Sequence, residues 1–426
     1  MQETPGTEAC GEAGTGPGAA ERELARTRRL AGAISWLLAE GPAMDGIEAL
    51  FDGFCRHLRE VGVALDRSTL HLRLLHPQIR AMTYIWRHGT DGVEAIERHH
   101  GIETTPGFRA SPIRAIAEEG LEGIRVRLDR VPGPYSYPVL DDLKEQGMTD
   151  YVALPMRFST GRRNVTTLAT RADGGFGTCD IALVSEVMPA FAALLEARAF
   201  RLLAANLLNT YVGRGAGARI LAGDIRRGSG ATLEAVLWYC DLRGFTPLSD
   251  RLPREQLIAL LNGYFEIMGG AVQGRGGEIL KFIGDALLAI FPVGETLDGA
   301  PGSSLGEACE RALAAATDAI EGMRRLNAGR AAWGQPILRA GIALHVGDVM
   351  YGNIGAPDRL DFTVIGPAVN LVSRIEGLCK RLDRAVLASD AFAASCGREL
   401  VSLGFHPVQG LTRPVEVFGL PGEGPR

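Results

Sequence analysis

The sequence has no block of basic residues. Its 45 Lys and Arg residues are outnumbered by 50 Asp and Glu residues, which gives a formal net charge of -5. A protein that binds the phosphate backbone of DNA or RNA normally carries a basic patch or stripe. The composition therefore argues against nucleic acid as a partner.

Cysteine is scarce and follows no motif. The chain has seven cysteines, an odd number, and none of them form a Cys-x-x-Cys pair. They are Cys10, Cys55, Cys179, Cys240, Cys309, Cys379 and Cys396. This scatter is typical of reduced thiols in a cytosolic protein and not of a disulfide framework or a zinc site.

Long apolar runs and targeting signals are also missing. The best candidate for a membrane span, Leu183 to Leu208, is interrupted by two glutamates and two arginines. The first residues, rich in Gly, Ala, Thr and Glu, lack the charged-then-apolar pattern of a signal peptide, so residues 1–21 are predicted to be a disordered tail. We expect a cytoplasmic protein without a membrane span.

Residues 22–180 are predicted to form an α+β domain. Apolar residues recur at helical spacing from Arg22 to Glu40 and from Met44 to Val61. Beyond them the apolar period changes to two, which indicates strands of an antiparallel sheet. The predicted strands are 69–75, 81–88, 123–129, 150–158 and 164–172, with short helices near 111–120 and 140–147.

The order of these elements resembles a GAF-type sensory domain. The resemblance is carried by SPIRAIAEEG (111–120) and GMTDYVALPMRFSTGRRNVTTLATRADGGFG (147–177), and it lies in the pattern and not in a chemical motif. A PAS-like or unrelated α+β domain remains an alternative. The resemblance implies that an unknown small-molecule or protein signal acts on this half of the chain.

Tandem histidines and three aromatic residues are conspicuous in this half. His99 and His100 could suggest a metal or haem site, but we interpret them as part of an exposed polar loop. Tyr84, Trp86 and Phe108 are interpreted as core residues and not as a ligand cage.

A long apolar-rich helix is predicted from Ile181 to Tyr211, with Pro189 marking a kink or a fresh helix start. Its leucines could pair with the same helix of a second chain, as a dimerising signal helix, or could pack on their own domain. We favour the first interpretation, because a sensor must be connected to its output. A Gly- and Arg-rich linker follows.

Two stretches in the second half carry chemistry. In VLWYCDLRGFTPLS (236–249) an apolar strand ends at Asp241, and a turn and a helix start follow. In GGEILKFIGDALLAIF (276–291) a hairpin bends at Gly284 and Asp285. Either aspartate alone would be ordinary turn chemistry. Together, beside a helix N-terminus, they predict a site for divalent metal and a polyphosphate.

The segment from about Ala231 to Leu420 resembles the catalytic domain of class III nucleotidyl cyclases. The resemblance implies an α+β fold with a ferredoxin-like βαββαβ core. It also implies that Asp241 and Asp285 hold two ions of Mg²⁺ or Mn²⁺ per site. The backbone N–H groups near the helix start would then face the β- and γ-phosphates of the substrate. These groups belong to Gly244, Phe245 and Thr246.

By the same resemblance, the nucleotide base is read by Lys281 and Thr363. Lys281 lies four residues before Asp285, where adenylate cyclases have lysine, and guanylate cyclases would have Glu and Cys at the two positions. Lys with Thr is the pattern of the class IIIb subgroup. Lys281 can donate to a ring acceptor of adenine, and the Thr363 hydroxyl can accept from its amino group. ATP is therefore the expected substrate.

The stretch VIGPAVNLVSRIEG places Asn370 and Arg374 four residues apart on one helix face. In the family the asparagine orients the ribose and the arginine stabilises charge on the transferring phosphate. The family also divides each site between two subunits, which implies a homodimer with shared active sites. One departure is Leu411, which stands near the position of a phosphate-binding lysine that Arg413 could replace.

These observations predict a sensor-regulated adenylate cyclase that converts ATP to 3′,5′-cyclic AMP and pyrophosphate. The expected segments are the tail 1–21, the GAF-like domain 22–180, the signalling helix and linker 181–230, and the catalytic domain 231–426. The alternative is a catalytically silent module that binds a nucleotide and regulates partners. A diguanylate cyclase is disfavoured because its Gly-Gly-Asp/Glu-Glu-Phe signature is missing.

Overall fold

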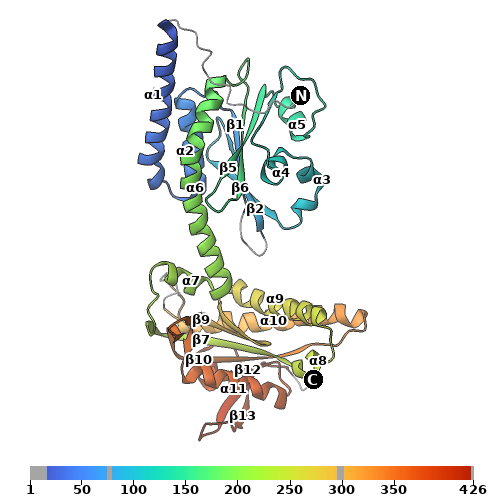
Figure 1. Ribbon diagram of the computed structural model, residues 1–426. Coiled ribbons are helices and arrows are strands. Elements are labelled where there is room, and N and C mark those ends of the chain that lie inside the picture. Colours follow the sequence, from blue (N-terminus) through green and yellow to red (C-terminus); the bar gives the residue numbers. More distant parts are fainter. Residues whose placement is uncertain (1–16, 74–78, 295–301, 424–426) are drawn as a thin grey trace. The chain divides into compact units, whose positions relative to one another are not determined.

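A computed structural model describes residues 17–73, 79–294 and 302–423. The chain divides into two compact units, Met1–Asn206 and Leu207–Arg426 (Figure 1). The first helix begins at Pro17, so the last five residues of the predicted tail are helical, and residues 1–16 lie outside the described part.

The N-terminal unit is built on an antiparallel sheet of six strands, in the order β3-β2-β1-β6-β5-β4. The strands are β1 (Arg67–Arg73), β2 (Ile79–Arg87), β3 (Val93–His99), β4 (Ile124–Arg127), β5 (Asp150–Arg157) and β6 (Arg163–Thr170). The sequence predicted all of these except β3. The sequence analysis missed β3 because it is an edge strand without a fully buried residue, so its apolar pattern is weak.

Helices cover both faces of this sheet (Figure 1). The helices are α1 (Pro17–Ala39), α2 (Gly46–Glu60), α3 (Pro106–Arg109), α4 (Pro112–Ala117), α5 (Val139–Glu145) and α6 (Thr178–Val212), with 3-10 turns η1 (Gly41–Ala43) and η2 (Ile102–Thr104). One core lies between the sheet and α1, α2 and α6, and Phe54 of α2 stacks on Phe191 of α6 with ring centroids 3.9 Å apart. A second core lies under α4 and α5.

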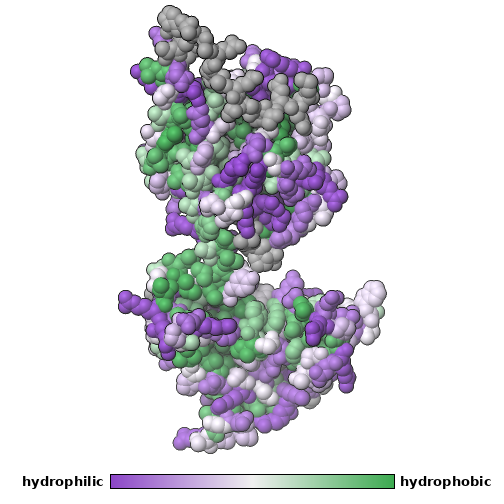
Figure 2. Space-filling view, viewed as in Figure 1, coloured by the Kyte–Doolittle hydropathy of each residue, from purple (hydrophilic) through white to green (hydrophobic). Residues whose placement is uncertain are grey.

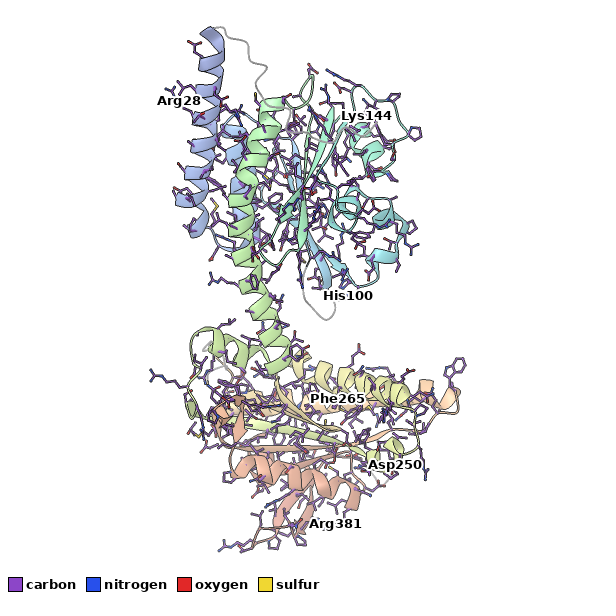
Figure 3. All side chains as sticks on the ribbon, in the orientation of Figure 1. Arg28, His100, Lys144, Asp250, Phe265 and Arg381 are labelled. Carbon is purple, nitrogen blue, oxygen red and sulfur yellow. The ribbon has the colours of Figure 1, made fainter. Side chains whose placement is uncertain are left out.

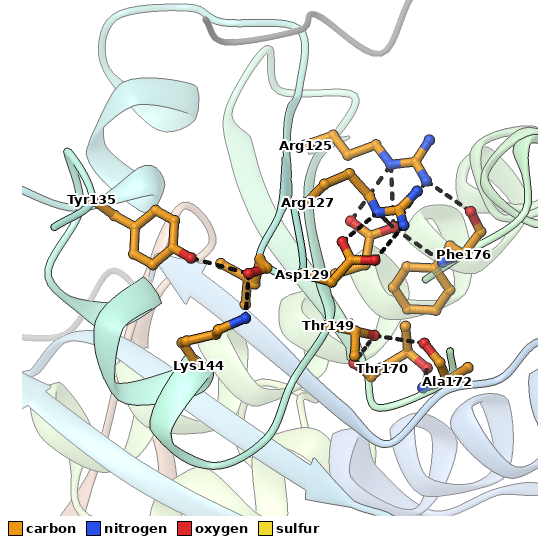
Figure 4. A network of polar contacts seen from close by, with 11 residues as sticks. Arg125, Arg127, Asp129, Tyr135, Lys144, Thr149, Thr170, Ala172 and Phe176 are labelled. Atoms are coloured by element: carbon orange, nitrogen blue, oxygen red, sulfur yellow. Dashed lines mark hydrogen bonds and ion pairs between the residues drawn. The ribbon is translucent and has the colours of Figure 1, made fainter. Parts of the chain in front are cut away.

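A polar cluster around a buried carboxylate ties the sheet to the start of α6, and Figure 4 shows Arg125 beside Phe176 in this cluster. Asp150 is fully buried and accepts hydrogen bonds from Arg125 Nη2 at 2.9 Å and from the Phe176 N–H at 3.0 Å. Arg125 also donates to the Phe176 carbonyl at 2.7 Å. Since a buried charge is costly without partners, this cluster fixes β4 and β5 against the segment that leads into α6.

The tandem histidines and the aromatic residues differ in their surroundings. His99 ends β3, and His100 follows in a turn; both are exposed, and His100 is labelled at the edge of this unit in Figure 3. Tyr84 and Trp86 are buried in the core, as predicted. Phe108 is only half-buried and lines a cavity, so its interpretation as a core residue is wrong.

The expectation that every cysteine is a reduced thiol is also wrong, because Cys179 is disulfide-bonded. Within the described residues the free cysteines are all buried: Cys55, Cys240, Cys309, Cys379 and Cys396. Cys10 lies outside the described part of the chain.

Helix α6 runs without interruption through Pro189 for 35 residues. Proline removes one helical hydrogen bond, but its neighbours Val187 and Phe191 are buried in the core, which holds the helix together. Its second half exposes apolar residues such as Phe200. Figure 2 shows hydrophobic residues gathered along this stretch of the chain. By length and composition alone α6 could cross a membrane, contrary to the sequence-based expectation, although its first half packs into the N-terminal unit.

The C-terminal unit contains a second sheet, in the order β13-β14-β12-β10-β7-β9-β8, with β11 paired to β10 outside this order. Among the named strands of the described residues, β10 and β12 form the one parallel pair. The strands are β7 (Gly230–Arg243), β8 (Glu278–Ile283), β9 (Ala286–Pro292), β10 (Arg339–Ala356), β11 (Arg359–Ile365), β12 (Val386–Ser389), β13 (Val401–His406) and β14 (Val415–Gly419).

Its helices are α7 (Arg214–Leu221), α8 (Phe245–Ser249), α9 (Arg254–Gly274), α10 (Leu305–Ala332), α11 (Pro367–Arg381) and α12 (Asp390–Ser395). The run β7-α9-β8-β9-α10-β10, with the spatial order β10-β7-β9-β8, is the ferredoxin-like βαββαβ arrangement that the sequence predicted. One core packs α9 and α10 on the sheet, and the other packs α7 and α11 on its opposite face. The predicted linker thus contains a helix, α7.

Candidate active site

Asp241 lies near the end of β7, on the face of the sheet that α11 covers. The side chains of β7 alternate, so that Trp238 and Cys240 pack under α9 and α10 while Leu237 packs on the α11 side. Asp241 follows this alternation to the α11 side. It is half-buried, and its Oδ1 accepts the N–H of Leu242 at 2.9 Å.

Asp285 lies in the turn between β8 and β9, where Gly284 has a φ of 64° and supplies the left-handed conformation that the turn requires. The pKa of Asp241 is raised to about 6, first by burial, then by a hydrogen bond with Asp285 and by its charge. The two predicted metal ligands therefore come together, and their carboxylates repel each other when both are ionised.

Two adjacent carboxylates are a suitable donor set for a hard divalent cation. Mg²⁺ typically takes one or two carboxylates and completes its shell with water and substrate phosphates. A cation between Asp241 and Asp285 would relieve the repulsion that, after burial, contributes to the raised pKa of Asp241. Within the described residues, no cluster of three or more His, Cys, Asp or Glu side chains offers a closed protein cage. Because Mg²⁺ bound by two carboxylates takes further ligands from water and phosphates, the pair fits a metal that shares its coordination with a substrate.

The predicted phosphate-facing segment follows directly after β7. Gly244 has a φ of 73° and precedes α8, which begins at Phe245. No side chain caps this helix start. Gly244 and Thr246 are exposed, so this helix start lies at the surface.

Lys281 reaches the α11 side of the sheet because β8 is irregular. The register between β8 and β9 shifts between Ile279 and Lys281. After the shift Lys281 is paired with Leu288, which is paired in turn with Tyr239 on β7. Tyr239 is two residues before Asp241 and shares its face. The β-bulge thereby places Lys281 on the same face as the carboxylate pair.

Lys281 forms an ion pair with Asp361 of β11, a residue that the sequence analysis did not single out. Thr363, the predicted partner of Lys281 in base recognition, is two residues further along β11 and therefore points to the same side as Asp361. The structure brings Lys281, Asp361 and Thr363 to one place through the contact of β8 with β11. The signal in the sequence was the acidic residue Asp361 two positions before Thr363, on the same face of the strand.

Asn370 and Arg374 lie on α11, away from the sheet. The helix buries Val372 and Ile375 against the sheet and leaves Asn370 exposed on the other side. Arg374 is half-buried beside the loop between β13 and β14, where a Cβ added to Gly410 would lie 3.2 Å from two guanidinium nitrogens. These two residues share a surface, as predicted, but they do not face the carboxylate pair of their own chain.

Glu376 is a third carboxylate near the pair that sequence reasoning missed. It projects from α11 toward Gly341, which is paired with Asp241 across β10 and β7. A Cβ at Gly341 would lie 2.1 Å from Glu376 Oε1, so only glycine leaves room for this side chain. Burial raises the pKa of Glu376 to about 7, and the charges of Asp241 and Asp285 contribute in the same direction. The signal in the sequence was that Glu376 falls on the apolar, buried face of the predicted helix.

Residues 231–397 match the family model of the adenylate and guanylate cyclase catalytic domain. The adenylate cyclase of Anabaena cylindrica is 35% identical over 168 residues, which cover 39% of this chain and 32% of that protein. Adenylate cyclase 1 of Rhizobium meliloti is 30% identical over 194 residues, covering 44% of this chain and 28% of that protein. Residues 231–397 form a class III nucleotidyl cyclase catalytic domain.

The cyclase domain is also similar to solved structures. The adenylyl cyclase CyaB from P. aeruginosa is 28% identical, with a TM-score of 0.38, over 45% of this chain and 95% of that chain. The guanylyl cyclase Cya2 is 30% identical, with a TM-score of 0.40, over 46% of this chain and 95% of that chain. The order of helices and strands and the match to the family model show an α+β protein, with a C-terminal cyclase domain and an N-terminal antiparallel-sheet domain of unassigned type.

Proposed function

We propose that this protein is an adenylate cyclase that converts ATP to 3′,5′-cyclic AMP and pyrophosphate. The observation that carries the choice of ATP is the position of Lys281. Its ammonium group is paired with Asp361, close to Thr363, and lies on the face of the sheet that also bears Asp241. Its support from relatives is the match to adenylate cyclases over the catalytic domain.

The base-reading residues match the hydrogen-bonding groups of adenine. The N1 atom of adenine is an acceptor and its 6-amino group is a donor, so the Lys281 ammonium can donate and the Thr363 hydroxyl can accept. Guanine presents the opposite pattern, with an N1–H donor and an O6 acceptor. Lys281 would then face a donor, while the ion pair with Asp361 keeps its ammonium group in position.

Asp241 and Asp285 would hold Mg²⁺ or Mn²⁺, two ions per site. When bound, such ions activate the ribose 3′-oxygen and neutralise charge on the phosphates during in-line displacement. The N–H groups of Gly244, Phe245 and Thr246 would bind the β- and γ-phosphates. Glu376, whose pKa burial and the charge of Asp241 raise to about 7, adds negative potential to the site when it is ionised.

Asn370 would orient the ribose and Arg374 would stabilise charge on the transferring phosphate. Both lie on the outer side of α11, whereas Asp241 faces its inner side. This separation supports a head-to-tail homodimer, in which each of two sites combines carboxylates from one chain with Asn370 and Arg374 from the other. We further propose that the N-terminal domain, GAF-like in its pattern, regulates the output, and that the protein acts in the cytoplasm, where ATP is available.

The test is cyclic nucleotide formation by the purified full-length chain with Mn-ATP and, separately, with Mn-GTP. We expect cyclic AMP from ATP and negligible product from GTP. Asp285→Ala should abolish the product. Asp318→Ala, which removes an exposed carboxylate paired with Arg275 on the surface, should retain it and is the matched control.

Two outcomes would contradict the proposal. Cyclic GMP as the main product would overturn the base assignment while leaving the cyclase activity. If neither product forms, the assay is repeated on residues 207–426, the second compact unit. Activity there would indicate a cyclase inhibited by its N-terminal half, and continued inactivity with retained Mn-ATP binding would favour the nucleotide-binding regulatory module.

A further inference from the structure

The N-terminal unit contains a cavity of about 360 Å³ that has no part in the cyclase chemistry. Its floor is the face of the sheet formed by β1, β2, β3 and β6, and its roof is formed by η2, α3 and α4. Figure 1 shows α3 and α4 on this side of the sheet, opposite to α2 and α6. Pockets that bind small organic molecules typically have volumes of a few hundred Å³.

The cavity is cationic. Four arginines line it, Arg73, Arg80, Arg98 and Arg163, against two carboxylates, Glu103 and Glu118. Arg73 lies 3.6 Å from Glu118, and Arg163 donates to the Gly120 carbonyl at 2.8 Å and to Glu122 at 3.2 Å. The wall formed by β2 and β3 thus carries the arginines that are least committed to ion pairs.

Two of these arginines, Arg80 and Arg98, come from neighbouring strands. Arg98 donates to the Thr83 hydroxyl in a long hydrogen bond of 3.4 Å, which leaves most of its guanidinium donors for another acceptor. Among the described residues, the carboxylate that acts on Arg80 is that of Glu103 on the opposite wall. A ligand with an acidic group would therefore find guanidinium donors that the described part of the chain does not saturate.

The local electrostatics at the cavity floor are consistent with this picture. His71 lies between Thr69 and Thr83, at 2.9 and 3.2 Å from their hydroxyls. Its pKa is lowered to about 3, first by burial and then by the positive charges of Arg67 and Arg98. The histidine is therefore neutral at physiological pH, and the positive potential around it is that of the arginines.

The side of the cavity opposite to Arg80 and Arg98 has an apolar wall beside the carboxylate of Glu103. Phe108 of α3 and Ile113 of α4 contribute their side chains from the roof, and Val165 contributes from β6. Between the two sides, the buried amide of Asn164 faces the cavity and fixes β1 by accepting the Arg73 N–H at 3.0 Å. The pocket therefore offers a cationic wall and an apolar wall to a single occupant.

We propose that this cavity binds a small organic anion that consists of one carboxylate on an apolar body. The carboxylate lies against Arg80 and Arg98, and the body packs against Phe108 and Ile113. An inorganic anion would leave the apolar wall and most of the volume unused. A neutral body of the same shape would leave the arginines without an acceptor.

The experiment is calorimetric titration of the full-length chain with 2-naphthoate, indole-3-acetate, 2-naphthamide and inorganic phosphate. We expect the two carboxylates to bind, and 2-naphthamide, which has the same body as 2-naphthoate without its charge, to bind about tenfold more weakly or worse. Inorganic phosphate should bind more weakly than either carboxylate, since it lacks the apolar body.

Variants assign the binding to the cavity. Arg98→Gln and Arg80→Gln should each weaken 2-naphthoate by about fivefold or more and should leave 2-naphthamide unchanged. Arg87→Gln is the matched control, because Arg87 lies on β2 but forms an exposed ion pair with Glu94 outside the cavity. Thermal melting followed by circular dichroism verifies that each variant is folded. Because two arginines are substituted separately, the test still holds if one of the two variants does not fold.

The outcomes are decisive in both directions. If neither carboxylate binds, if 2-naphthamide binds as tightly as 2-naphthoate, or if Arg87→Gln weakens binding as much as Arg98→Gln, the proposal is wrong. Since the readout is binding and not cyclic nucleotide formation, its failure would leave the proposed cyclase activity untouched, and failure of that activity would leave this result standing.

Discussion

Shared active sites predict the behaviour of a mixture of two inactive variants. Asp241→Ala removes one of the paired carboxylates, and Arg374→Ala removes the guanidinium on the outer side of α11. Each variant alone should be inactive. In a mixed dimer, however, one site combines the intact Asp241 of one chain with the intact Arg374 of the other, while the second site carries both lesions.

The size of the recovery follows from counting sites. Random pairing of equal amounts of the two chains gives mixed dimers in half of all cases, and each mixed dimer has one complete site of two. The mixture should therefore regain about a quarter of the wild-type rate per chain for a symmetric dimer. The assay is cyclic AMP formation from Mn-ATP by the co-expressed chains, with different affinity tags to confirm that mixed dimers form.

A second mixture provides the control. Asp241→Ala with Asp285→Ala places both lesions in the same carboxylate pair, so neither site of a mixed dimer is complete and no activity should return. If the first mixture stays inactive although tagged mixed dimers are isolated, the sites are not shared between chains. Equal recovery in both mixtures would refute the division of residues as well.

Three further predictions test the described contacts. Gly341→Ala places a Cβ against Glu376 and should lower the free energy of unfolding by on the order of 1–3 kcal/mol, measured in urea, whereas Gly329→Ala, with nothing within 4 Å, should not. Asp361→Asn removes an exposed ion pair and should leave the melting temperature nearly unchanged. It should raise the KM for ATP, because Lys281 loses the partner that holds its ammonium group in position. The pKa of His71 is about 3 in the folded chain, below its unfolded value, so the unfolded chain binds more protons at acid pH. The free energy of unfolding should therefore fall as the pH drops from about 6.5, by about 2 kcal/mol at pH 5. Calorimetry of the His71→Gln variant should show a smaller loss over the same range.

The elements that the sequence predicted best have strong periodic patterns. The strands of the N-terminal sheet, except β3, and the βαββαβ run of the cyclase domain were predicted from alternation and helical spacing. The errors arose where packing overrides local preference. Pro189 does not end α6, because buried neighbours on both sides hold the helix, and the Gly- and Arg-rich linker contains α7, whose Gly215 N–H donates to Glu278 at 2.7 Å.

For the candidate site, the sequence supplied the residue types and the structure supplied their partners. Asp241 and Asp285 could be singled out because each lies at or close to a turn beside an apolar strand, and the structure brings their carboxylates together. Asp361 and Glu376 carry no turn or motif signal of their own. The first is brought to Lys281 by the contact of β8 with β11, and the second fits only because Gly341 lacks a side chain.

The sequence by itself determined which residues could carry the chemistry of this protein, because strand alternation, turn residues and helical spacing are local properties of the chain. It also fixed the order of the cyclase elements. Tertiary structure alone decided which side chains meet, since a β-bulge turns Lys281 onto the face of Asp241 and the packing of α11 turns Arg374 away from it. The cationic cavity of the N-terminal unit has the same origin, because its arginines come from strands and loops that only the folded sheet brings together.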